Sequence, residues 1–247
     1  APRLLTPADV ALLAAMNIPL VPVTRRPQVA LISTGDELVM PGDTPGSDQI
    51  IVSNTFGLKA MLESLGAQAR ILPIARDTQN ALRTAFELAE GADLLVTIGG
   101  ASVGDHDLVA SVAAELGLER SFYKVAMRPG KPLMAGRMSG AAMVGLPGNP
   151  VSAMVCGEVF LAPMIRAMLG LPTAQPPLQQ ATLAHPLPAN GPREHYMRAH
   201  VDKGHLRAFE NQDSSLLSVL ADANALLVRA PQDGPRQAGE KVQYLPL

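Results

Sequence analysis

Between Val29 and Leu169, short β-branched or aliphatic runs alternate with amphipathic segments of helix length. This alternation constrains the fold more than any other feature of the chain, because it is typical of a mainly parallel sheet covered by helices. The runs predict strands at 29–33, 70–75, 93–98, 122–127, 133–135 and 142–146. Capping and stop residues predict helices from Ser53 or Asn54 to Gly66, from Asp77 to Gly91, over 107–116, and over 150–169. We therefore expect an α/β domain over residues 27–170.

A proline-rich linker, residues 171–177, ends this pattern. After it, helical periodicity largely disappears, and short strands with turn residues take over. Residues 178–247 are therefore expected to form a small all-β domain.

Residues 1–26 are expected to form a short N-terminal helix and a linker. The stretch Thr6-Pro7-Ala8-Asp9 offers an N-cap, a first-turn proline and an N3 carboxylate. The apolar run 10–23 resembles the core of a signal sequence, but Asn17 and two prolines interrupt it. No run approaches the ~20 apolar residues of a membrane span. The chain starts at Ala1 rather than Met, so we expect a piece of a longer protein.

Charge and cysteine content narrow the classes of partner. With 20 Lys and Arg against 22 Asp and Glu, the net charge of −2 offers no overall field for nucleic acid or an acidic membrane. Any anion site must therefore be local. The single Cys156 cannot form an internal disulfide, so we expect a reducing, cytoplasmic location and a small buried side chain at this position.

Three loops that follow predicted strands carry an unusual share of polar and glycine residues. In open α/β sheets, ligands bind outside the carboxyl ends of the strands. The loops are Thr34-Gly35-Asp36-Glu37, the stretch from Gly99 to Asp107, and Pro147-Gly148-Asn149-Pro150. Their glycines let backbone N–H groups approach an anion, so two of them are candidate phosphate cradles. The alternative is that they are plain connectors.

Cations and carboxylates both lie near these loops. Lys124, Arg128 and Lys131 form a cluster that is either a solvated face or a clamp for an oxyanion. The carboxylates Asp36, Glu37, Asp105 and Asp107 would repel an anion unless a hard divalent cation such as Mg²⁺ bridged them to it. The mixture indicates metal-assisted phosphoanhydride chemistry.

One short motif supports a rival hypothesis. Residues 100–104 satisfy G-x-S-x-G, so Ser102 could be the nucleophile of a serine hydrolase, with Asp202 and His205 as partners. No upstream oxyanion segment of the HGGG type exists, and charged residues follow the motif directly. His195, His200 and His205 recur every five residues in a β-rich stretch, which places neighbours on opposite faces and disfavours a zinc site.

Four ordered motifs together resemble the molybdopterin molybdenumtransferase family, which includes the MoeA proteins and the gephyrin E domain. They are Ser33-Thr34-Gly35-Asp36-Glu37-Leu38, the stretch from Thr97 to Asp107, the stretch from Lys124 to Pro132, and the stretch from Gly145 to Ala153. The C-terminal tail agrees, through Arg193, Arg198, Asp213-Ser214-Ser215, Ala223-Asn224-Ala225 and Gly239-Glu240.

This resemblance implies a three-layer αβα molybdopterin-binding domain with a mostly parallel sheet, followed by a barrel-like β-domain. It also implies Mg²⁺-dependent insertion of molybdate into adenylylated molybdopterin, with release of AMP. The implied catalytic residues are Glu37, Asp107, Lys124 and Lys131, and the implied metal ligands are Asp36, Glu37, Asp105 and Asp107. The implied binding residues are Thr34, Gly35, Gly99, Gly100, Ser102, Gly104, Arg128, Pro147, Gly148, Asn149, Pro150, Arg193, Ser214 and Ser215.

The resemblance also implies a homodimer and a molybdopterin adenylyltransferase as a possible partner. Two positions depart from the family pattern: Val52 stands where an Asp is usual, and Val109-Ala110 stands where many members carry a Lys. Family members have further N-terminal domains, so we expect this chain to bind the pterin but to insert molybdenum poorly alone. A non-catalytic pterin-binding or scaffolding module is the alternative function on the same fold.

Overall fold

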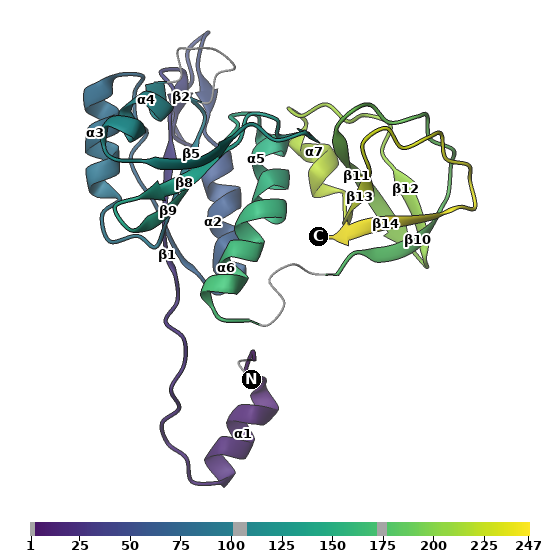
Figure 1. Cartoon of the computed structure of the whole chain (residues 1–247), viewed down its shortest axis with the longest axis horizontal. Helices are drawn as coiled ribbons and strands as arrows, with labels where there is room; N and C mark the ends of the chain where they lie inside the picture. Colours follow the sequence, from purple (N-terminus) through teal and green to yellow (C-terminus); the bar gives the residue numbers. More distant parts are fainter. Residues whose placement is uncertain (1–2, 101–107, 172–176) are drawn as a thin grey trace.

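The computed structural model describes residues 3–100, 108–171 and 177–247. The chain forms an α/β domain, a smaller β-domain beside it, and an N-terminal arm that extends away from both (Figure 1). The α/β domain and the barrel-like β-domain confirm the fold class that the sequence pattern and the family resemblance predict.

The central sheet of the α/β domain is mostly parallel. Its strand order is β4-β1-β5-β9-β8-β6, in which β4, β1, β5 and β9 are parallel and β8 is antiparallel to both neighbours. The strands are β1 (Gln28–Ser33), β4 (Gln68–Ile71), β5 (Leu94–Ile98), β6 (Glu119–Tyr123), β8 (Met134–Met138) and β9 (Ala141–Leu146).

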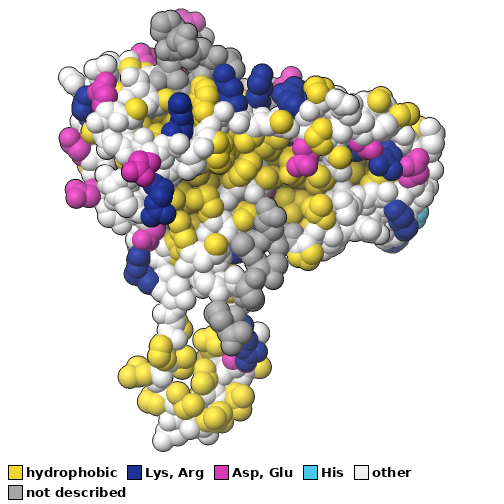
Figure 2. All heavy atoms as spheres, in the orientation of Figure 1, with side chains coloured by type: hydrophobic (Ala, Val, Ile, Leu, Met, Phe, Trp, Pro, Cys, Tyr) yellow, Lys and Arg dark blue, Asp and Glu magenta, His cyan; other side chains and the backbone are white. Residues whose placement is uncertain are grey.

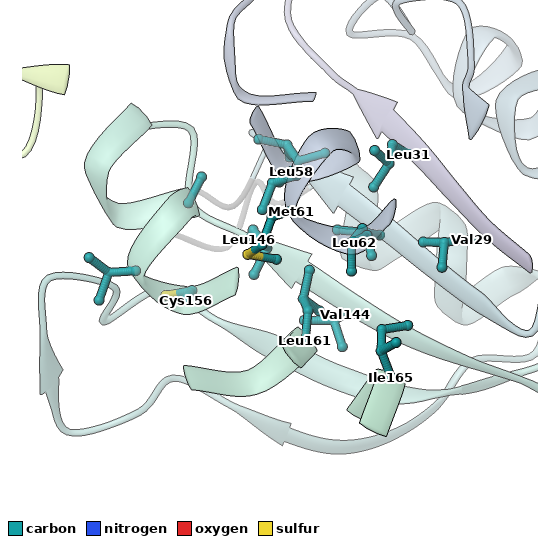
Figure 3. Packing of buried hydrophobic residues seen from close by; sticks show 14 of the residues in the cluster. Val29, Leu31, Leu58, Met61, Leu62, Val144, Leu146, Cys156, Leu161 and Ile165 are labelled. Carbon is teal, nitrogen blue, oxygen red and sulfur yellow. The ribbon is translucent and has the colours of Figure 1, made fainter. Parts of the chain in front are cut away.

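Helices cover both faces of this sheet, because alternate residues of β1 point to opposite sides. Val29 and Leu31 pack into a core with α2 (Asn54–Ser64) and the long helix that starts at Pro150 (Figure 3). Ala30 and Ile32 pack into a second core with α3 (Gln79–Leu88) and α4 (Leu108–Glu115). The sheet and the helices packed on each of its faces are the three layers, and one core lies between each pair of adjacent layers.

Several element boundaries differ from the sequence prediction. Helix α3 is capped by the side chain of Thr78, which accepts from the Ala81 amide, and not by Asp77. Strand β4 ends at Ile71 rather than continuing to residue 75. The predicted strand 122–127 is two elements, β6 and the short β7 (Met127–Arg128), because Lys124 adopts a positive φ of 74° between them.

The long helix consists of α5 (Pro150–Cys156), a π-helical turn η1 (Gly157–Leu161) and α6 (Ala162–Met168). Among the described residues, this one helix is long and apolar enough to cross a membrane. The expectation that no run approaches the length of a membrane span is therefore wrong. Half of it is buried inside the protein, however, and it packs on the sheet as a core helix. Composition alone could not distinguish the two.

The β-domain is a small barrel. Its strand order is β12-β10-β14-β13-β11, and pairing of β11 with β12 closes the sheet. A short helix, α7 (Leu217–Ala221), lies between β12 and β13. The strands are β10 (Gln179–Leu183), β11 (Glu194–Asp202), β12 (His205–Ala208), β13 (Ala225–Arg229) and β14 (Lys241–Pro246).

The two domains share a strand pairing and part of a core. Strand β7 of the α/β domain pairs in parallel with β11 of the barrel, and this register places Arg128 opposite His195. Leu226 and Leu245 of the barrel are buried in the core of the α/β domain that contains the long helix. The barrel is therefore held against the α/β domain close to the cationic loop.

The N-terminal arm begins with α1 (Pro7–Ala15), which starts as predicted. The Thr6 hydroxyl accepts from the Asp9 amide while the Asp9 carboxylate accepts from the Thr6 amide, a complete capping box. No residue of α1 is buried. Apolar side chains gather on the arm in Figure 2. Leu4, Leu20 and Val23 of this stretch are exposed.

Candidate functional site

A cavity of about 600 Å³ lies where β1, β5 and β9 end, at the edge that the topology predicts for a ligand. The loop between β12 and α7 of the barrel also reaches it, through Ser215. Eight of the predicted site residues line the cavity: Thr34, Glu37, Gly99, Pro147, Gly148, Asn149, Pro150 and Ser215. The structure therefore brings together four segments that are far apart in the sequence.

The other predicted site residues either do not line this cavity or lie outside the described part of the chain. Ser102, Gly104, Asp105 and Asp107 fall outside the described residues, as does most of the loop after β5. The described ones that do not line the cavity are Gly35, Asp36, Gly100, Lys124, Arg128, Lys131, Arg193 and Ser214.

Gly99 lets the ends of β1 and β5 approach each other. Its φ is +92°, and a Cβ there would stand 2.6 Å from the carbonyl oxygen of Thr34. A Cβ on Gly148 would in turn stand 3.5 Å from the Cα of Gly99. The three backbones meet so closely that only glycine fits at position 99.

Two buried hydroxyls at the cavity, Ser33 Oγ and Thr34 Oγ1, have no hydrogen-bond partner among the described residues. A third unpaired hydroxyl, Thr97 Oγ1, is buried in β5 and does not line the cavity. Ser33 and Thr34 line the cavity and are each 2% exposed. A buried polar group is normally paired, and an unpaired one often marks the place of a ligand, ion or water. These hydroxyls therefore fit a polar ligand at the strand ends.

Three carboxylates gather beside the first loop. Asp77 lies close to Asp36 and Glu37, and the Asp77 amide donates to the Asp36 carboxylate at 3.1 Å. Partial burial and the negative charges of Asp36 and Glu37 raise the pKa of Asp77. Arg76 holds this turn by donating to the carbonyl oxygens of Asp36 and Leu38.

Sequence reasoning missed Asp77, which it interpreted only as a helix cap. A usable signal was present, because Asp77 follows the β4 segment at the same edge of the sheet as Asp36 and Glu37. The three carboxylates offer hard oxygen donors, and their mutual repulsion is what a bound cation would relieve. Mg²⁺ typically takes one or two carboxylates and completes its shell with water and substrate phosphates, so Asp36 and Glu37 have the donor chemistry that would suit it beside a bound phosphate. Within the described residues, no group of three His, Cys, Asp or Glu side chains is placed so that it could hold a metal ion by itself.

The cationic residues come from both domains. The Lys124 ammonium lies 5.0 Å from the centre of the Tyr123 ring, and the backbone of Lys124 is bonded to Leu133 across the loop. Gly130, at φ +104°, faces the Sγ atom of Cys156, which leaves no room for a side chain there. Cys156 is buried, as predicted, and burial raises the pKa of its thiol to about 12.

The pKa of His195 reflects the positive charges around its side chain. Burial, together with the charges of Arg128, Arg229, Arg193 and Arg198, lowers the pKa of His195 to about 4. The histidine is therefore neutral at physiological pH. Arg198 and Arg229 are bonded within the barrel, so Arg128 and Arg193 are the two that could meet an oxyanion.

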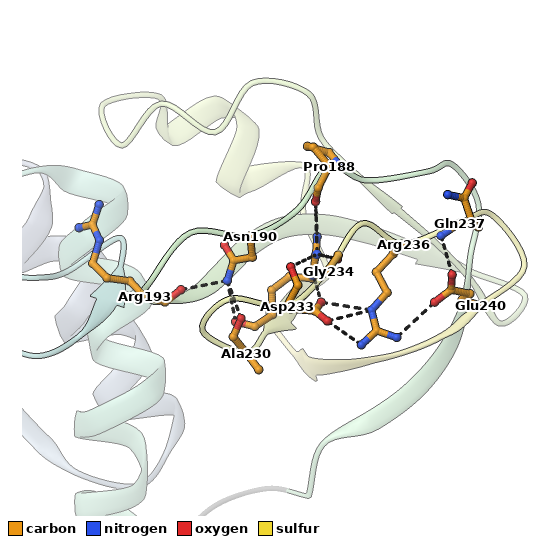
Figure 4. A network of polar contacts seen from close by, with 10 residues as sticks. Pro188, Asn190, Arg193, Ala230, Asp233, Gly234, Arg236, Gln237 and Glu240 are labelled. Carbon is orange, nitrogen blue, oxygen red and sulfur yellow. Dashed lines mark hydrogen bonds and ion pairs between the residues drawn. The ribbon is translucent and has the colours of Figure 1, made fainter.

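A polar network in the barrel holds the segment that carries Arg193 (Figure 4). The Asn190 side-chain amide donates to the carbonyl oxygen of Arg193 at 2.9 Å and to that of Ala230 at 2.7 Å. Buried Arg229 pairs with Asp233, which also accepts from Arg236. In Figure 4 the Arg193 side chain points away from this network. Its guanidinium is free of any such bond to the other described residues.

The two departures from the family pattern, at Val52 and at Val109, lie in different surroundings. Val52 is buried and lines the cavity, so an apolar side chain replaces a carboxylate at the wall. Val109 is buried in the core between α3 and α4, next to Gly100. The first departure changes the chemistry of the cavity, and the second changes core packing.

The partners of the rival serine-hydrolase hypothesis lie elsewhere. Asp202 and His205 line a separate cavity of about 880 Å³ in the barrel, together with His200. His195 is buried beside β7 instead. Ser102 lies outside the described residues. His195 therefore does not share the cavity of His200 and His205, and the triad stays a prediction whose nucleophile lies outside the described residues.

Comparison with known proteins gives consistent matches along the chain. Residues 30–167 match the family described as "Probable molybdopterin binding domain", and residues 180–247 match "MoeA C-terminal region (domain IV)". A molybdopterin molybdenumtransferase from Nostoc sp. is 36% identical over 91% of this chain and 54% of its own length. One from Haemophilus influenzae is 34% identical over 98% of this chain and 61% of its own length.

Solved structures agree. The molybdopterin biosynthesis MoeA protein from Pyrococcus horikosii superposes with a TM-score of 0.83 at 30% identity, covering 96% of this chain and 58% of that one. The chain thus spans between about half and three-fifths of the length of these relatives.

Proposed function

This chain belongs to the family of molybdopterin-binding domains and carries the C-terminal region of MoeA proteins, and on this premise we propose that it acts in molybdenum cofactor biosynthesis. The proposed reaction is the insertion of molybdate into adenylylated molybdopterin, with release of AMP. The chain would supply the pterin-binding cavity of the enzyme.

The observation that carries this proposal is that a carboxylate, hydroxyl groups and a side-chain amide line the same cavity. Glu37 and the unpaired hydroxyl of Thr34 lie on its wall. Asn149, the N-cap residue of α5, and Ser215 of the barrel also line it. A ligand with both a polar ring system and a phosphoanhydride would use such a mixture of acceptors, donors and nearby cations.

Mg²⁺ would be held by Asp36 and Glu37, with Asp105 and Asp107 from the loop after β5. When bound, it would neutralise the phosphate charge and polarise the phosphoanhydride. Lys124, Arg128, Lys131 and Arg193 attract the oxygens of phosphate or molybdate and hold them in position. Asp77 adds negative charge beside Asp36 and so strengthens the hold on a cation.

The family resemblance also supports a homodimer, a cytoplasmic location and a molybdopterin adenylyltransferase as the partner that supplies the substrate. We include these in the proposal.

A non-catalytic pterin-binding or scaffolding module on the same fold is the second candidate function, because buried Val52 stands at the cavity wall where the family usually has an Asp. Such a module would bind the pterin in the same cavity without turning it over. The two functions differ in whether AMP is released from the bound ligand.

The test is AMP release from adenylylated molybdopterin in the presence of Mg²⁺ and molybdate. The proposed enzyme releases AMP, and Lys131→Ala lowers the rate at least about tenfold, because a charge-assisted contact contributes ~1.5–3 kcal/mol. Lys203→Ala, which removes a cation from a turn of the barrel, serves as the control and leaves the rate unchanged. Binding without AMP release would support the non-catalytic module, and no binding would refute both.

A further inference from the structure

Arg198 on β11 is a charged residue in the interior of the barrel, with an exposed fraction of 2%. Its guanidinium does not reach the cavity. One terminal nitrogen donates to the carbonyl oxygens of Asp213 at 2.8 Å and Leu216 at 3.3 Å. The charged guanidinium of Arg198 is therefore bonded to the backbone of the loop between β12 and α7.

Gln212 completes this arrangement. Its side-chain oxygen accepts from the backbone amide of Arg198 at 3.0 Å and from Nε of Arg198 at 3.3 Å. Its side-chain nitrogen donates to the carbonyl oxygens of Arg198 and Phe209. Hydrogen bonds thus hold both ends of the loop to β11. The buried side chain of Arg198 lies at the centre of these bonds.

The fastened loop meets the α/β domain at the first turn of α5. The Val151 amide donates to the carbonyl oxygen of Ser214 at 3.0 Å, and the Asn149 side chain donates to the Ser214 hydroxyl at 3.2 Å. The next residue, Ser215, lines the cavity. The position of Ser215 in the cavity therefore depends on a loop whose shape is set from within the barrel.

We infer that Arg198 is a positioning residue, which holds Ser214 on the first turn of α5 and thereby holds Ser215 in the cavity. Arg198 touches no ligand in this account. It acts through the carbonyl oxygens of Asp213 and Leu216. The consequence for ligand binding rests on the proposed function, whereas the consequence for the loop does not.

The first arm of the test measures the loop without any ligand. In the full chain, hydrogen exchange of the Val151 amide reports its bond to Ser214. Arg198→Met removes the donors and raises the exchange rate of this amide about tenfold or more. Arg198→Lys keeps one cationic donor and gives an intermediate rate. Arg229→Met is the control, because Arg229 is an equally buried arginine of the same barrel that bonds Pro188 and Gly234 instead.

Exchange at Val151 that rises in Arg198→Met but not in Arg229→Met supports the inference. Unchanged exchange in Arg198→Met, or an equal rise in both variants, would overturn it. If Arg198→Met does not fold, the comparison of Arg198→Lys with wild type decides by the same criterion.

The second arm measures binding of molybdate by calorimetry in wild type, Arg198→Lys, Ser215→Ala and the double variant. Because Arg198 acts through this loop, the double variant loses less affinity than the product of the two single losses. Independent losses would show that Arg198 acts by another route and would overturn the inference. If wild type binds no molybdate, the proposed function is weakened, and the exchange measurement alone decides on Arg198.

Discussion

The backbone amide of Val151 donates to the carbonyl oxygen of Ser214 at 3.0 Å, across the boundary between the two domains. Asn149, two residues earlier, bonds the hydroxyl of the same serine. Free amides at a helix N-terminus favour an anion, yet here one of them is already used by the barrel. The structure therefore makes the barrel loop part of the cavity wall.

We predict that Thr34→Val leaves the free energy of unfolding unchanged or slightly higher, because the buried Thr34 hydroxyl has no partner among the described residues. The same variant weakens binding of adenylylated molybdopterin, because that hydroxyl lies on the cavity wall. Urea denaturation and equilibrium binding measure the two effects. Thr55→Val removes another buried, unpaired hydroxyl outside the cavity, and it should match the first effect without the second.

Gly99→Ala is predicted to destabilise the fold more than Gly91→Ala does. Both glycines have positive φ, which costs an alanine about 1–2 kcal/mol. At Gly99 the added Cβ also meets the Thr34 carbonyl oxygen, whereas at Gly91 nothing lies within 4 Å. Overpacking of this kind adds roughly 1–3 kcal/mol. Equal losses in urea denaturation would contradict the close approach of the two strand ends.

Stability should fall between about pH 6.5 and pH 4, because of His195. Its pKa is about 4 in the folded chain and about 6.5 when unfolded, so the unfolded chain binds the proton first as the pH falls. The resulting loss is on the order of 3 kcal/mol. His195→Gln should flatten the dependence, and His205→Gln, at an exposed position, should keep it. A steep loss that persists in His195→Gln would assign the effect to other groups.

Removal of residues 1–24 should leave the melting temperature of the rest of the chain unchanged. No described residue in this stretch is buried, and the truncated chain keeps the ion pair of Arg25 with Asp93. Differential scanning calorimetry of the two chains makes the comparison. A drop of several degrees would mean that the arm packs on the body of the protein in solution.

Much of the α/β domain could be predicted from the sequence, because local patterns determine it. Strand β1 and helices α2 and α4 lie close to their expected positions, where periodicity and glycine stops act within a few residues. The split of segment 122–127 could not be predicted, because β7 exists through its pairing with β11 of the barrel. That pairing is tertiary and leaves no local pattern.

The cavity was predictable in outline for the same reason. Strand ends of a parallel sheet meet at one edge, which brings Glu37, Gly99 and Asn149 together. Asp77 was missed, because a carboxylate before a helix has the same local appearance whether it caps the helix or faces another carboxylate. The role of Arg198 in the barrel loop depends on burial and on backbone acceptors 15 and 18 residues away, so no local pattern indicates it.

Equilibrium binding of adenylylated molybdopterin in the presence of Mg²⁺ tests the central claim most directly, with wild type compared with Glu37→Gln and Asp48→Asn. Glu37 lines the cavity, whereas Asp48 is an exposed carboxylate of the same segment with no bond to other described residues. We predict that Glu37→Gln weakens binding at least about tenfold and that Asp48→Asn does not change it. Tight binding that is unaffected by Glu37→Gln would place the ligand elsewhere and contradict the account.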